Sequence, residues 1–133
     1  MKHGTNLPAG GPDPALEQLV RELIARIADK WTMVALEVLE AEGRVRFTRL
    51  GELIGGISQK MLTKTLRQMQ ADGLVERTVY AVVPPRVEYA LTPLGASLGE
   101  AFCGVWQWAE ANRAAVERAR AAFEARERSI GLL

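Results

Sequence analysis

Residues 57–73, ISQKMLTKTLRQMQADG, carry the clearest helical pattern in this chain. Ser58 is a favourable N-cap, because its hydroxyl can accept a backbone N–H of the first turn. Gly73 can adopt the left-handed conformation that ends a helix. Between them, apolar residues recur at spacings of four and three, which places Leu62, Leu66 and Met69 on one helical face. The sequence therefore predicts an amphipathic helix over residues 58–72.

The opposite face of this helix has an unusual charge. It carries three cations and no acid before Asp72. The outward residues are Gln59, Lys60, Thr63, Lys64, Arg67 and Gln68. A solvated helix face normally mixes both signs, because Glu–Lys pairs four residues apart stabilise it. A cationic face with amides and hydroxyls suits phosphates and base edges instead. We interpret this segment as a DNA recognition helix.

The residues before this helix predict a second, shorter helix. Residues 44–47 are expected to be extended, and Thr48 to cap a brief helix over residues 49–54 that ends at Gly55-Gly56. The two glycines lack the spacing of a phosphate-binding loop and do not stand between a strand and a helix. They indicate a tight turn between two helices. A short helix, a turn with glycine and a longer helix form the helix-turn-helix pattern.

After Gly73 the period of the pattern changes to two. Residues 74–80 and 87–91 alternate and are rich in β-branched and aromatic side chains, which is typical of strands. The link over residues 81–86 contains two prolines, which cannot join a central ladder. We therefore expect a β-hairpin directly after the recognition helix, as in a wing. Arg86, at its tip, would lie near the DNA backbone or the minor groove.

Helices are also expected on both sides of this motif. Asp13-Pro14 starts one, whose apolar stripe from Leu16 to Ile27 could cover a core or pair with a second chain. The next helix, residues 31–42, is apolar nearly all round and should be central to the core.

The last predicted helix begins at Thr92-Pro93. Asn112 is expected to cap a final alanine-rich segment over residues 113–128. That segment has little apolar surface, so we expect it to pack on another subunit or to fray.

These elements predict a mainly α fold with a small β-hairpin wing, in the α+β class. The expected organisation is a flexible N-terminal arm over residues 1–12, a winged helix-turn-helix domain with dimerisation helices over residues 13–111, and a C-terminal helical extension over residues 112–133. A length of 133 residues allows one domain with a real core.

The distribution of charge supports a polyanionic partner. The whole chain has a net charge of only +1. Between Arg44 and Arg86, however, eight cations face three acids, which gives +5, while nine cations and thirteen acids elsewhere give −4. This split favours a middle segment that binds a polyanion.

Other classes of protein are disfavoured by the composition. The only histidine, His3, lies in the N-terminal arm, and no metal cluster, cofactor loop or catalytic constellation is present, so we expect no enzyme, metal or cofactor. No apolar run is long enough for a membrane span and no signal sequence is seen, so we expect a cytoplasmic protein. A winged helix used only for protein interaction remains the alternative. Its helix would more often be neutralised by acids or carry an apolar patch.

Several runs resemble the HxlR-type winged helix-turn-helix regulators of bacteria. They are DKWT from Asp29, RFTRL from Arg46, GISQKMLT from Gly56, DGLVER from Asp72 and VPPRVEYALTPLG from Val83. The resemblance implies a homodimeric transcriptional regulator that dimerises through its first and fifth helices and places the recognition helix in the major groove of double-stranded DNA. A small-molecule effector at the dimer interface is a further possible partner. The candidate DNA-binding residues are Thr48, Arg49, Ser58, Gln59, Lys60, Thr63, Lys64, Arg67 and Arg86.

The chain departs from this family at one position. Many members carry a cysteine in the first helix, ahead of the tryptophan that matches Trp31, and sense oxidants or electrophiles with it. Here residues 16–20 contain no cysteine. The single cysteine, Cys103, has no cation or histidine beside it in the sequence to activate its thiol. We expect it to be a small buried packing residue, so sensing by the usual route of the family is not expected.

Overall fold

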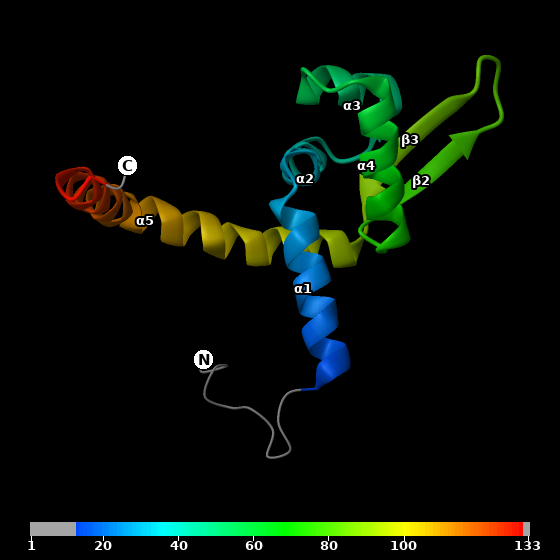
Figure 1. Cartoon of the computed structure of the whole chain (residues 1–133). Coiled ribbons are helices and arrows are strands. Elements are labelled where there is room, and N and C mark those ends of the chain that lie inside the picture. The colour runs from blue at the N-terminus through cyan, green and yellow to red at the C-terminus, as the bar shows by residue number, and fades with distance from the viewer. Residues whose placement is uncertain (1–12, 132–133) are drawn as a thin grey trace. The chain divides into compact units, whose positions relative to one another are not determined.

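A computed structural model of the chain describes residues 13–131 (Figure 1). In chain order the elements are α1 (Pro14–Ala28), α2 (Lys30–Glu42), β1 (Val45–Arg46), α3 (Phe47–Ile54), α4 (Gln59–Ala71), β2 (Val75–Tyr80), β3 (Arg86–Leu91) and α5 (Pro93–Ser129). The chain divides into two units, one that ends at Ala96 and one that starts at Ser97. The predicted N-terminal arm lies outside the described residues.

The predicted fold class is confirmed. The strands form one antiparallel sheet in the order β1-β3-β2, and the β2–β3 hairpin follows α4 directly (Figure 1). The expected extended segment before α3 is the short strand β1, which pairs with β3. No helix within residues 13–131 is both long and apolar enough to cross a lipid bilayer.

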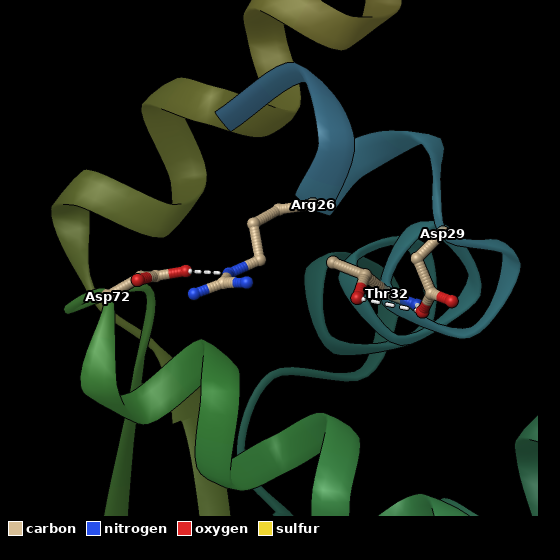
Figure 2. Close-up of polar contacts among 4 residues, drawn as sticks. All are labelled: Arg26, Asp29, Thr32 and Asp72. Carbon is tan, nitrogen blue, oxygen red and sulfur yellow. Dashed lines mark hydrogen bonds and ion pairs between the residues drawn. The ribbon is translucent and has the colours of Figure 1, made fainter. Parts of the chain in front are cut away.

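The core of the first unit lies between α2, α4 and the sheet. Its buried apolar side chains are Ala35, Leu36, Leu39, Val45, Leu50, Leu62, Leu66, Met69, Leu74, Val75 and Tyr89. Helix α2 buries Thr32, Ala35, Leu36 and Leu39, which lie on one helical face, while the other large apolar residues of its all-round pattern are only partly buried. At its start, Thr32 donates hydrogen bonds from N and Oγ1 to Asp29 Oδ2, both at 3.1 Å (Figure 2). Asp29 thus caps α2 and satisfies a buried hydroxyl at the same time.

An ion pair connects α1 with the end of α4. Arg26 Nε donates to Asp72 Oδ2 at 2.6 Å across a half-buried contact (Figure 2). The hydrogen bond and the charge of Asp72 raise the pKa of Arg26 above its ordinary value. Because Asp72 is the C-cap of α4, this pair holds α1 against the last turn of that helix.

The start of α5 is joined to the end of α4 through the loop at Gly73. Gly73 has a φ of +77°, as expected for a residue that ends a helix. Thr92 Oγ1 donates to Gly73 O at 2.6 Å and accepts from Gly95 N at 3.0 Å. Thr92 N donates to Leu74 O at 3.0 Å. The hydroxyl of Thr92 therefore caps α5, as predicted, and fixes the hairpin to α4.

Two predicted helix caps are wrong. Helix α3 begins at Phe47, and its N-cap is Arg46, whose side chain makes no capping hydrogen bond. Strand β1 runs straight into the helix, so Thr48 is already inside the first turn. Helix α5 continues through Asn112 without a break. Asn112 Nδ2 donates to Trp108 O at 2.8 Å, a bond back into the preceding turn, which is compatible with a continuing helix.

The predicted burial of Cys103 is also wrong for the described chain, where this residue is exposed. The unit that starts at Ser97 contains one helix, so no second layer within it covers Cys103. The large apolar residues Val105, Trp106, Trp108 and Phe123 are exposed for the same reason.

Gly95 provides a test of the junction between α4, β2 and α5. A Cβ at this position would overlap the backbone carbonyl of Leu74, whereas a Cβ at Gly104, in the same helix, would meet nothing within 4 Å. Gly95→Ala should destabilise the fold by about 1–3 kcal/mol through overpacking. Gly104→Ala should stabilise it by about 0.5–1 kcal/mol, because alanine is the better helix former. Urea unfolding of both variants would measure this, and equal effects would contradict the junction as described.

Candidate functional site

Helix α4 is held by a cap and by one buried face. Ser58 Oγ accepts from Met61 N at 3.0 Å, which confirms the predicted N-cap. The buried residues of the helix are Leu62, Thr65, Leu66 and Met69. The N-terminal half of the opposite face is exposed, namely Gln59, Lys60, Thr63 and Lys64, followed by Arg67 one turn later. The predicted polar face is therefore open to a partner.

The hairpin lies beside α4 (Figure 1). In its register Arg77 pairs with Tyr89 and Thr78 pairs with Glu88. Because side chains alternate along a strand, Arg77 and Tyr89 share the face of the sheet that contributes to the core. Tyr89 is buried, and its ring centroid lies 6.3 Å from that of Phe47 at the start of α3. These two rings join α3 to the sheet.

A groove with a volume of about 850 Å³ lies between α4, the start of α3 and the hairpin. The residues that line it are Arg46, Phe47, Thr48, Thr63, Arg67, Gln70, Arg77, Val82, Val83, Pro84, Pro85, Arg86, Val87 and Tyr89. Four of them are arginines and none is an acid. A concave surface with this charge suits an anionic ligand.

The groove brings together some of the nine predicted site residues. Thr48, Thr63, Arg67 and Arg86 line it. Arg49, Ser58, Gln59, Lys60 and Lys64 lie outside it, on α3 and on the N-terminal half of α4.

Two of the predicted arginines have partners within the chain. Arg49 Nη1 lies 3.3 Å from Glu52 Oε1. Arg86 was predicted to lie at the tip of the hairpin, but in the structure it is the first residue of β3. Its guanidinium lies 4.3 Å from the ring centroid of Tyr80, and its Nε lies 3.2 Å from Glu88 Oε2 without the alignment of a hydrogen bond. Arg86 therefore supports the hairpin as well as being a candidate contact.

Three polar residues of the groove were missed as site candidates: Arg46, Gln70 and Arg77. A signal for Arg77 was present in the sequence, because it interrupts a strand face whose other members, Val75 and Val79, are apolar. Arg77 is exposed in the structure, so its charge is open to solvent or to a ligand from outside the chain.

The sequence profile of the HxlR-like helix-turn-helix family matches residues 26–117. The chain belongs to this family. A relative named as an uncharacterised transcriptional regulator, YtfH of Escherichia coli K12, is 41% identical over 92 residues, which cover 69% of this chain and 72% of the relative. The regulator YybR of Bacillus subtilis, named in the same way, is 38% identical over 94 residues, 71% of this chain and 74% of YybR.

Solved structures of the same kind share the fold. The regulator YtfH of Salmonella typhimurium has a TM-score of 0.64 at 37% identity, over 76% of this chain and 89% of that one. The reduced form of the regulator YodB of B. subtilis has a TM-score of 0.62 at 32% identity, over 68% and 87% of the two chains. The HxlR-like chain described here is thus a helix-turn-helix transcriptional regulator, which binds DNA and is not an enzyme.

Ser58 offers a test of how α4 is positioned. Ser58→Ala should lower the free energy of unfolding by about 0.5–2 kcal/mol, because Met61 N loses its side-chain acceptor. Ser58→Asn should keep most of the stability, because asparagine caps helices about as well as serine does. Chemical unfolding would compare the two variants. An asparagine variant as unstable as the alanine variant would argue against capping as the role of this hydroxyl.

Proposed function

We propose that this protein is a homodimeric regulator that reads a pseudo-palindromic DNA site, with α4 in the major groove and the β2–β3 hairpin as the wing. The observation that carries the proposal is the exposed face of α4. It presents three cations, amides and a hydroxyl, while the other face of the same helix is fixed in the core. A regulator of this kind would act in the cytoplasm, where it can reach chromosomal DNA.

The N-terminal part of α4 is the proposed reader of base edges. Helix-turn-helix proteins use this part of the recognition helix for sequence, so Gln59, Lys60 and Thr63 are the candidates for specificity. A glutamine can pair with adenine, and a lysine can reach O6 and N7 of guanine. Lys64 and Arg67, further along the helix, would contact phosphates.

The remaining candidates surround this helix. Ser58 precedes it, and Thr48 and Arg49 stand in the first turn of α3, where phosphate contacts would fix the position of the helix on the duplex. Arg86 would act with the hairpin, on the backbone or on the shape of the minor groove.

A second copy of the chain is the proposed partner of α1 and α5. No residue of α1 is buried, although the helix has a clear apolar stripe. The exposed members of the stripe are Leu16, Leu19, Val20 and Ile24. Helix α5 exposes Val105, Trp106, Trp108 and Phe123. Stripes of this size are rarely left open on a stable monomer. A two-fold dimer would present its recognition helices about 34–36 Å apart, one turn of DNA.

A small-molecule effector would bind between the two copies. On α5, Trp106, Trp108 and Val116 border an open hollow of about 490 Å³, which is also lined by Ala109 and the charged residues Glu110, Arg113, Glu117 and Arg120. Aromatic and aliphatic side chains next to polar groups are typical of sites for small ligands.

The alternative, a winged helix that contacts only proteins, has weaker support. Such a module would be expected to neutralise the exposed face of α4 or to cover it with apolar side chains. No ion pair within residues 13–131 involves Lys60, Lys64 or Arg67. Three free cations on one helix favour a polyanion.

The reading helix can be tested by separating base contacts from phosphate contacts. A high-affinity site is first selected from a pool of random duplexes with the parent protein. Gln59→Ala should lose about 1–3 kcal/mol of binding on that site and little on random DNA. Lys64→Ala should weaken both and lower the slope of log K against log salt by about one.

Both side chains are exposed, so thermal stability should stay nearly constant and serves as the control. If both variants are folded and bind the selected site as well as the parent protein does, the assignment of α4 as the reading helix is contradicted.

The dimer can be tested on the stripe of α1. Sedimentation velocity of the parent protein at micromolar concentration should show a dimer. Val20→Glu should shift it towards monomer, because a charge would have to be buried at the interface. Ala25→Glu adds the same charge to the same helix outside the stripe and should leave the dimer intact. A monomeric parent protein, or equal effects of the two substitutions, would contradict an interface on this stripe.

A further inference from the structure

The arginines between residues 44 and 86 fall into two groups. Three have acidic partners, namely Arg44 with Glu76 at 2.7 Å, Arg49 with Glu52 at 3.3 Å and Arg86 with Glu88 at 3.2 Å. The other three, Arg46, Arg67 and Arg77, make no ion pair with any residue in the described part of the chain. All three of these free arginines line the groove between α4 and the hairpin.

The two faces of the hairpin also differ in whether their charged side chains have partners within the chain. The register places Thr78 opposite Glu88 and Tyr80 opposite Arg86, so these side chains share one face. On that face Arg86 lies over Tyr80 and pairs with Glu88, while Arg44 donates to Thr78 Oγ1 and Glu76 Oε2. The charges that the hairpin carries on this face are therefore largely satisfied within the protein, although Arg46 of β1, which is in register with Glu88, forms no ion pair with any described residue.

The other face of the hairpin carries Arg77, in register with the buried Tyr89. Arg77 is exposed and forms no ion pair with an acid among residues 13–131. A cation in line with core residues gains nothing from its neighbours, because Val75, Val87 and Tyr89 offer it no carboxylate. Its charge is therefore available to an anion from outside the chain.

Helix α4 forms the facing wall of the groove. Thr63, Arg67 and Gln70 lie at i, i+4 and i+7, so they share one side of the helix, and all three are exposed. A hydroxyl, a guanidinium and an amide in one row are donors for phosphate oxygens. Lys60 and Lys64 are not part of this wall. The exposed surface of α4 thus has one edge that faces the groove and another that faces away from it.

We propose that this groove holds the phosphates of one DNA strand where the strand passes between the major groove read by α4 and the minor groove beside the hairpin, with Arg67 and Arg77 on opposite walls. The proposal rests on the proposed function and adds Arg77, Arg46 and Gln70, which all line the groove, to the candidate DNA contacts. Arginine suits this role because its planar fork can donate two parallel hydrogen bonds to one phosphate.

The test compares two arginines of the same sheet region that differ in pairing. Arg77→Gln and Arg44→Gln remove the same charge, but Arg44 is paired with Glu76 and Arg77 is free. The probe is a labelled duplex of mixed sequence, titrated at several potassium chloride concentrations, since non-specific binding is almost wholly electrostatic. Arg77→Gln should lower the salt slope by about one and weaken binding at every salt concentration, whereas Arg44→Gln should leave the slope unchanged.

Two further variants locate the contact. Arg77→Lys keeps the charge and should retain most of the salt slope. Arg67→Gln combined with Arg77→Gln should lower the slope by about two, because the two walls would grip different oxygens or neighbouring phosphates of one strand. Circular dichroism melts of all variants serve as the folding control.

Each outcome bears on one proposal. If Arg77→Gln and Arg44→Gln have the same effect on the slope, the groove is not a phosphate seat, although α4 can still read DNA. If the parent protein shows no salt-dependent binding to any duplex, the proposed function itself fails. If Arg77→Gln weakens binding to poly-L-glutamate but not to the duplex, the groove belongs to an acidic protein segment, and the DNA assignment is overturned.

Discussion

Burial of one face of α4 fixes the rotation of this helix and therefore decides which of its side chains are exposed. Leu62, Leu66 and Met69 are almost wholly inaccessible to solvent. Truncation of such a residue to alanine costs about 2–5 kcal/mol, so any rotation of the helix that exposed the three together would cost far more than the fold can supply. The direction of the polar face therefore follows from the core. The helix does not need a ligand in order to be oriented, so the side chains that we propose as readers of DNA are already exposed in the free protein.

Polar contacts at the C-terminal end of α4 connect this helix to α1 and α5. Asp72 accepts a hydrogen bond from Arg26 of α1 (Figure 2). The carbonyl of Gly73 accepts one from Thr92, which follows β3 and caps α5. In the proposed dimer, α1 would contact the second copy. The ion pair between α1 and the end of α4 would then link the dimer interface to the recognition helix. The distance between the two recognition helices would depend on how the two copies of α1 pack. A displacement of α1 would reach α4 through Arg26 and Asp72 without any change in the core.

Most of the fold could be predicted, because each element carries its own periodic pattern and its own start or stop residue. The recognition helix, the hairpin and the start of α5 are of this kind. The two wrong caps, Thr48 and Asn112, are residues that often cap helices but stand here inside continuous ones, since the cap depends on backbone conformation that the sequence does not display. Arg77 was missed as a groove residue for a different reason. Alternation assigns it to a face of the strand, but the extent to which α4 covers that face is a matter of tertiary packing.

Ion pairing within the chain determines which cations of residues 44–86 remain free at the surface. Between Arg44 and Arg86 the sequence has an excess of five positive charges. In the structure the paired cations of this segment are Arg44, Arg49 and Arg86, and the five without an acidic partner among the described residues are Arg46, Lys60, Lys64, Arg67 and Arg77. All five lie on α4 or along the groove beside it. Like charges gathered in this way repel one another, and the repulsion falls when a polyanion neutralises them. The electrostatic cost that these side chains impose on the free protein is thus a source of affinity for the duplex.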